Sequence, residues 1–333
     1  MRVGVCIPGD HEHATAATLA LVRDCGFSAV FLECREDTQD AVGLQLGEFS
    51  RECRREGIEC YAVPCGYGGV VTTPSGLRSV FLRLRPGARQ IDSRGRPADR
   101  ACPNDPEYLD WFAARMADLA ELLGCDGLLW NEPAFLYARG IWACRCLNCQ
   151  RVYESEYDEQ MPAELSYRVL NVRQRSITIF LLAAAAAIKR VNRRGRSLVL
   201  TAPGLAHEQL HLGVDHVTGL LDSSGVDGVV LRVDWPTAYV GMEETVARMA
   251  RPALMEAETR GKEVLIWLKG TAHPQDRLIE TLRFASRLGI PGVVLADYDA
   301  LVGDPSFESM RPRLLAAIAA AAGDASADDS PGR

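Results

Sequence analysis

The sequence lacks an excess of basic residues, and this argues against one large class of partner. Its 333 residues include 37 Lys and Arg against 44 Asp and Glu, so that the formal net charge is -7. Binding to nucleic acid depends on clustered Lys and Arg that release counterions from phosphates. We therefore expect no nucleic-acid partner.

Long apolar runs are missing as well. The chain starts directly with a short apolar stretch at residues 2–8, without a charged segment followed by a long apolar run. Secretory signals need such a run, and a membrane-spanning helix needs about 20 apolar residues. The sequence therefore predicts a cytoplasmic protein with no signal peptide and no membrane partner.

No Gly-x-Gly-x-x-Gly loop follows the first apolar stretch, which disfavours a dinucleotide-binding sheet. The chain instead alternates short runs rich in Val, Ile and Leu with helical stretches. Such runs suit parallel strands that are covered on both faces. Eight of them predict a (β/α)8 TIM barrel, with strands at residues 3–8, 29–35, 60–66, 127–133, 197–204, 228–235, 263–270 and 292–299.

Two insertions break the regular spacing, at about residues 67–107 and 134–162, and both follow strands. Loops after strands lie on the C-terminal face of a barrel, where active sites are built. We expect residues 1–322 to form one barrel domain with these two insertions. The polar segment at 323–333 is predicted to be a disordered tail, because it has too little apolar surface to offset the entropy of ordering.

The chain has eleven cysteines, and without a secretion signal they are not expected to form a disulfide framework. Seven fall on predicted strands or near helix ends, where Cys behaves as a small apolar residue. Cys144, Cys146 and Cys149 are clustered within one insertion, and Cys102 lies in the other. Four thiolates complete a tetrahedral zinc site with no open position, so we expect a structural zinc; free or redox-active thiols are the alternative.

The strand at 127–133 ends abruptly in Asn131-Glu132-Pro133. Pro133 cannot continue the ladder, so this strand would deliver a carboxyl group to the mouth of the barrel. Because alternate side chains of a strand share a face, an inward Glu132 predicts an inward Trp130. The equivalent ends of other strands carry Glu33 and Arg35, Cys65, Arg232 and Asp234, Trp267 and Lys269, and Asp297 and Asp299.

Histidines near the strand ends leave a second kind of site open. His11, Glu12 and His13 follow the first strand and His273 follows the seventh. They could reach the mouth and hold a catalytic metal, although the chain has no His-Glu-x-x-His motif. Residues 11–13 could equally start the first helix.

These motifs together resemble the family 42 glycoside hydrolases (β-galactosidases) and related barrel hydrolases of the same clan. The resemblance covers residues 102–153: Cys-Pro-Asn-Asp-Pro-Glu-Tyr at 102–108, Asn-Glu-Pro at 131–133, Cys-x-Cys-x-x-Cys at 144–149, and Tyr153. It implies that Glu132 is the general acid/base and that Asn131 binds a sugar hydroxyl. It also implies that the cysteine quartet, Cys102 included, binds zinc.

The chain departs from this family at the seventh strand, where the clan places its nucleophilic Glu. Here that strand ends in Lys269, and Glu263 falls at its opposite end. A retaining mechanism is therefore in doubt, and Asp234 or Asp297 would serve as base or nucleophile beside Glu132. An inverting pair needs carboxyl groups about 6.5–9.5 Å apart.

The interpretation with most support is a glycosidase that acts on a small carbohydrate or glycoside, with zinc as a structural ion and no organic cofactor. Arg35, Arg232 and Lys269 favour an anionic substrate. The predicted substrate-binding residues are Glu33, Arg35, Trp130, Asn131, Arg232, Trp267, Lys269 and Tyr298. One alternative is a sugar isomerase, epimerase or lyase that uses Lys269 with Glu132. Another is a non-catalytic carbohydrate-binding barrel; a homo-oligomer is left open.

Overall fold

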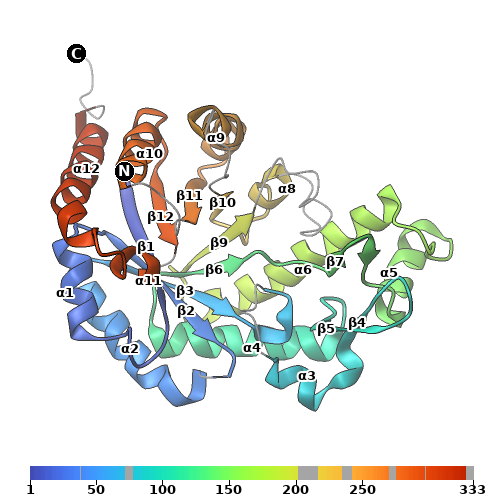
Figure 1. Ribbon diagram of the computed structural model, residues 1–333. Helices are drawn as coiled ribbons and strands as arrows, with labels where there is room; N and C mark the ends of the chain where they lie inside the picture. Colours follow the sequence, from blue (N-terminus) through green and yellow to red (C-terminus); the bar gives the residue numbers. More distant parts are fainter. Residues whose placement is uncertain are drawn as a thin grey trace.

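A computed structural model describes residues 1–37, 39–71, 78–201, 217–234, 242–269, 275–296 and 298–327. Its centre is a closed barrel of eight parallel strands in the order β1-β12-β11-β10-β9-β6-β3-β2 (Figure 1). The predicted TIM barrel is confirmed. The strands are β1 (Arg2–Pro8), β2 (Ala29–Arg35), β3 (Glu59–Cys65), β6 (Gly127–Asn131), β9 (Arg196–Thr201), β10 (Gly228–Asp234), β11 (Glu263–Lys269) and β12 (Gly292–Ala296).

Helices cover the outside of the barrel (Figure 1). They are α1 (Ala16–Asp24), α2 (Gln39–Arg55), α4 (Pro106–Leu123), α6 (Tyr167–Val191), α8 (Val217–Leu221), α9 (Met242–Thr259), α10 (Gln275–Arg287), α11 (Tyr298–Val302) and α12 (Phe307–Ala327). The start of α4 shows how sequence fixes such an end: the Asp105 side chain accepts a hydrogen bond from the backbone of Tyr108, and Pro106 occupies the first turn. Among the described residues, no helix is both long and apolar enough to cross a membrane.

Side-chain alternation divides the apolar residues of the barrel strands between two cores. One core fills the barrel interior and includes Phe31 and Tyr61, whose rings stack with centroids 4.8 Å apart. The larger core lies between the outer faces of the strands and the helices. A strand residue that belongs to the interior core therefore faces into the barrel, and one that belongs to the larger core faces the helices.

Two long connections depart from the simple barrel. Between β3 and α4 the chain forms η1 (Tyr67–Gly69), α3 (Val80–Leu84), η2 (Pro86–Ala88), β4 (Arg89–Ile91) and β5 (Pro97–Ala101). Between β6 and α6 it forms β7 (Tyr137–Ala138), β8 (Ile141–Trp142) and α5 (Leu147–Tyr157). Backbone hydrogen bonds join the two connections, from Arg145 to Ile91 at 2.8 Å and from Ser93 to Trp142 at 2.7 Å. Figure 1 shows them together beside the barrel.

A ring of charges closes the N-terminal end of the barrel. Arg2 pairs with both Glu59 and Glu263, and Arg196 pairs with the same two carboxylates. These four residues begin β1, β3, β9 and β11. The ring confirms that Glu263 lies at the end of β11 opposite the mouth.

The last helix extends farther than the sequence predicts. α12 continues to Ala327, inside the segment 323–333 that we expected to be disordered. The alanine-rich stretch before it has high helix propensity, and an established helix adds each further residue at little cost. Residues 328–333 lie outside the described part of the chain.

Candidate functional site

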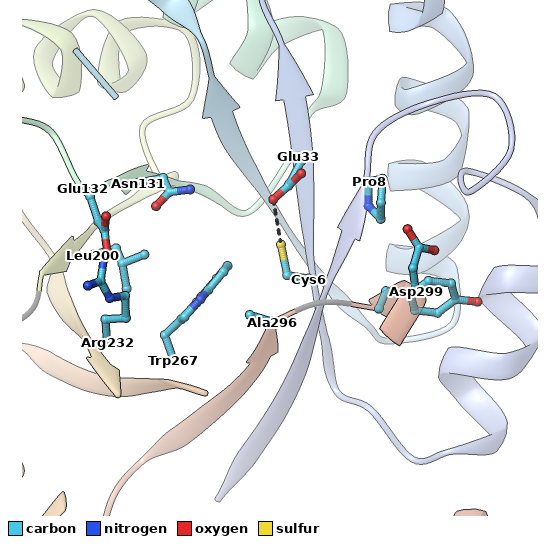
Figure 2. Close-up of a pocket in the computed structure, with 11 residues that line it drawn as sticks. Cys6, Pro8, Glu33, Asn131, Glu132, Leu200, Arg232, Trp267, Ala296 and Asp299 are labelled. Atoms are coloured by element: carbon cyan, nitrogen blue, oxygen red, sulfur yellow. Dashed lines mark hydrogen bonds and ion pairs between the residues drawn. The ribbon is translucent and has the colours of Figure 1, made fainter. Parts of the chain in front are cut away.

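A cavity of about 370 Å³ opens at the C-terminal ends of the strands. Figure 2 shows its side chains pointing inward from several strands and from α11. Parallel barrels build their sites at this end because every strand delivers its C-terminal residues there. The lining residues are Cys6, Pro8, Glu33, Asn131, Glu132, Leu200, Arg232, Trp267, Ala296, Tyr298 and Asp299.

Glu132 follows the last residue of β6 and has an unusual backbone conformation. Its φ is +47°, in the left-handed region that side chains other than glycine seldom adopt. The following residue is Pro133, and a residue before proline normally takes an extended conformation. Such strain costs about 1–3 kcal/mol and tends to occur at functional sites. This conformation places the Glu132 side chain in the cavity, directly after the last residue of β6.

Two arginines stand near Glu132. The Arg232 guanidinium forms an ion pair with the Glu132 carboxylate, and both side chains are more than four-fifths buried. Arg100, from β5, donates to the carbonyl of Ala134 at 3.3 Å and is close enough for its charge to interact with Glu132. Burial lowers the pKa of Arg100 despite that carboxylate. Arg100 was not predictable as a neighbour of Glu132, because it belongs to the connection between β3 and α4.

Trp130 is a correction to the sequence analysis, which predicted it inside the barrel. It belongs to the outer core, its indole N–H donates to the Ser197 hydroxyl at 3.0 Å, and its ring packs against Phe112 of α4. The prediction was wrong because the alternation of side chains along β6 ends at Asn131, and Glu132 has a positive φ. The inward positions of β6 are Leu129, which belongs to the interior core, and Asn131, which lines the cavity.

Glu33 lies near the C-terminal end of β2 and faces the barrel interior, as Phe31 does. The Cys6 thiol donates to its carboxylate, with 3.8 Å between sulfur and oxygen (Figure 2). Cys6 was predicted only as an apolar strand residue. The cavity is thus lined by three carboxyl groups, those of Glu33, Glu132 and Asp299.

Trp267 and Tyr298 supply aromatic surface. Trp267 meets Phe31 edge-on, with centroids 6.3 Å apart, and Figure 2 shows its indole between the Glu132 and Glu33 sides of the cavity. Tyr298, at the start of α11, is 9% exposed. An indole face in a small cavity offers a stacking surface for a sugar ring.

Several predicted residues are not brought to the cavity or cannot be placed. Arg35 is exposed and pairs with Asp37 at 2.9 Å, so it is not among the lining residues. Strand register sets Asp234 beside Lys269, but their side chains lie outside the described part of the chain. Asp297 and the predicted histidine His273 also lie outside it.

His13 links the loop after β1 to α11. Its Nδ1 is 2.6 Å from an Asp10 carboxylate oxygen, and its Nε2 is 2.7 Å from one of Asp299. Burial disfavours the charged imidazole, but these two carboxylates outweigh burial and raise the pKa of His13. Asp299 is predicted at a strand end but lies in the first turn of α11, because β12 ends at Ala296.

The four cysteines Cys102, Cys144, Cys146 and Cys149 lie together where the two long connections meet. Their sulfur atoms are all within 4.8 Å of one another, so the cluster could hold a metal ion. Donors point at the sulfurs: the Asn104 amide donates to Cys149 at 3.3 Å, and the backbone of Ile91 donates to Cys144 at 3.4 Å. Such donors stabilise thiolates, the form that binds metal, so the residues fit a metal.

Comparisons with known proteins give relatives by structure alone. No protein-family model matches the chain, and no curated protein matches its sequence. A β-galactosidase from the haloarchaeon Halorubrum lacusprofundi is 14% identical with a TM-score of 0.67; the match covers 89% of this chain and 52% of that one. A family 42 β-galactosidase from G. stearothermophilus is 10% identical with a TM-score of 0.69, covering 96% and 57%. A β-amylase catalytic domain from Paenibacillus polymyxa is 10% identical with a TM-score of 0.62, covering 90% and 93%.

These matches confirm the predicted resemblance to family 42 β-galactosidases as a distant one. At such low identity the likeness lies in the fold, a barrel that glycoside hydrolases use. The chain spans about half the length of the β-galactosidases it matches. Activity must therefore be argued from the site itself.

Proposed function

We propose that the protein is a glycoside hydrolase in which Glu132 is the general acid/base. The observation that carries this proposal is the strained conformation of Glu132, which aims a buried carboxyl group into the cavity directly after Asn131. A general acid must reach the glycosidic oxygen, and a strand end in a barrel mouth allows this. Asn131 would bind a sugar hydroxyl, while Trp267 and Tyr298 would pack against the ring.

Two of the three carboxylates proposed as the second catalytic group belong to strands two positions from β6. Asp234 ends β10, which is separated from β6 by β9; Glu33 lies two residues before the end of β2, which is separated from β6 by β3. With strands about 4.8 Å apart, either backbone lies about 9–10 Å from that of Glu132. This spacing suits an inverting enzyme, which keeps a water between its carboxyl groups. Asp297 follows β12, directly across the ring of eight strands, and is the third candidate.

We further propose a substrate with an anionic group. Arg232 holds the Glu132 carboxylate in an ion pair, and Glu132 can donate a proton only when that pair is loosened. A carboxylate or sulfate on the sugar would draw the guanidinium toward itself and free Glu132 for catalysis. Lys269, at the end of β11, would add a second positive charge.

Glu132→Gln tests the proposal. Nitrophenyl glycosides with neutral sugars and with uronic acids identify a substrate of the native protein; the variant should then lose at least about 100-fold in turnover while its unfolding midpoint barely moves. Glu164→Gln, on the exposed surface, should change neither. Full activity of Glu132→Gln would contradict the assignment.

The position of Lys269 favours a second candidate, a sugar isomerase, epimerase or lyase. β11 ends in this lysine, and its register places Lys269 beside Asp234. A lysine in a barrel mouth could act as a base or form a Schiff base, with Glu132 as its acid partner. Borohydride added with substrate would trap an adduct on Lys269 in that case. In the hydrolase, Lys269→Met should weaken binding of an anionic substrate without abolishing turnover.

We also propose that Cys102, Cys144, Cys146 and Cys149 hold a structural zinc. Four cysteine ligands leave no position for substrate, so the ion would join the two long connections and take no part in the reaction. None of the eleven cysteines, all of which the structure describes, is joined in a disulfide, which suits a reducing compartment such as the cytoplasm. Elemental analysis of the purified protein should give one zinc per chain; Cys146→Ser should lose the metal but keep the barrel.

A further inference from the structure

Arg173, in the middle of α6, is a buried charged residue whose guanidinium makes no hydrogen bond within the described part of the chain. Its side chain is 1% exposed. Within the described part of the chain, none of its three guanidinium nitrogens has a hydrogen-bond partner. An unpaired charge in a protein interior is strongly unfavourable, so buried arginines are normally paired with an anion.

The surroundings of Arg173 point to the cysteine cluster. Burial lowers the pKa of Arg173 to about 10, and negative charge on the Cys149 and Cys144 sulfurs opposes that shift. Ser176, one helical turn along α6, accepts a hydrogen bond at 2.9 Å from the Asn104 amide that also donates to Cys149. Residues three apart share a helix face, so α6 turns Arg173 toward the same cluster. The ring of Phe135 covers one face of the guanidinium, 5.2 Å from Cζ to centroid.

We infer that Arg173 is the counter-ion of a metal–tetrathiolate centre formed by the four cysteines. A divalent cation bound by four thiolates carries two net negative charges, and a buried centre of that charge needs positive charge nearby. The positive charge of Arg173 would thus compensate the negative charge of the metal–tetrathiolate centre. Because Arg173 makes no hydrogen bond to a sulfur, it acts as a positioned charge and leaves all four sulfurs for the metal.

This inference rests on the proposed zinc site and makes a prediction that a packing role would not. With metal bound, Arg173 stabilises the centre; without metal, it is an uncompensated buried cation. Arg173→Met keeps much of the side-chain volume and removes the charge. It should therefore weaken metal binding while leaving the metal-free protein as stable as the native one, or more so.

The experiment titrates metal-free protein with Co²⁺, followed by its thiolate charge-transfer absorption, and with Zn²⁺ against a chelator of known affinity. We expect Arg173→Met to lower affinity by about 10- to 100-fold, the usual effect of changing a residue that supports a metal ligand. Arg173→Lys should recover part of that loss. Arg175→Met, on the same helix but exposed and paired with Glu156, is the matched control and should bind as the native protein does.

The outcomes separate this inference from the proposal beneath it. Native protein that takes up no Co²⁺ or Zn²⁺ overturns the metal site and the counter-ion together. Native affinity in Arg173→Met overturns the counter-ion alone. If Arg173→Met does not fold, Arg173→Lys still decides: a metal affinity equal to that of a charge-neutral Arg173→Gln would show that the positive charge does not matter.

Discussion

Replacing Trp130 with Phe tests which way the end of β6 faces. The change removes two ring carbons at a site with no exposed surface, worth about 0.8 kcal/mol each. It also takes the indole donor from the Ser197 hydroxyl, worth about 1 kcal/mol. We expect the free energy of unfolding to fall by about 2–3 kcal/mol in total. Turnover of a substrate should be unchanged, because the side chain faces α4 and not the cavity.

The assay is equilibrium unfolding in urea, with the slope against denaturant checked to be the same in both proteins. Trp267→Phe is the control, since Trp267 lines the cavity and packs edge-on against Phe31. That change should weaken substrate binding more than it lowers stability. The reasoning is refuted if Trp130→Phe keeps its stability but loses substrate affinity, because Trp130 would then face the cavity.

Two further changes probe the frame of the site. His13→Gln should lower the free energy of unfolding more at pH about 6 than at pH about 9. The pKa of His13 is raised in the folded state, so its stabilising contribution is complete below the unfolded pKa of about 6.5. That contribution disappears as pH rises through the folded pKa. Equal losses of unfolding midpoint at both pH values would contradict the paired imidazolium. Gly68→Ala should cost at least about 2–3 kcal/mol in thermal unfolding, since φ is +67° and a Cβ would stand 2.2 Å from the Tyr108 ring. Gly140→Ala, also at positive φ but with nothing within 4 Å, should lose clearly less; similar losses would show that the Tyr108 contact does not matter.

The sequence predicted the barrel well because its signals are local. Each strand is a short apolar run between helices, and each run predicted from the sequence overlaps a strand of the structure. The cysteine cluster was also predictable, since three of its members lie within six residues. Its fourth, Cys102, comes close only because β4 and β8 bring the two connections together.

The cavity was harder to predict because single residues depart from regular geometry. A positive φ lets Glu132 line the cavity beside Asn131, so Trp130, two residues before it, faces outward. The early end of β12 moves Asp299 into a helix, where it meets His13. Arg35 lies two residues after Glu33, on the same face of the strand, but its side chain forms an ion pair with Asp37. Such contacts depend on the final few residues of a strand, which periodicity does not resolve.

The charged ring beneath the barrel has a kinetic consequence. Arg2, Arg196 and their two glutamates seal one end, and the stacked rings of Phe31 and Tyr61 fill the space above them. The cavity at the C-terminal ends of the strands is therefore closed beneath its floor. In the proposed glycosidase, a sugar bound against that floor would leave on the side from which the next substrate enters. We then expect the released sugar to compete with incoming substrate; purely non-competitive inhibition by that sugar would indicate a second way out.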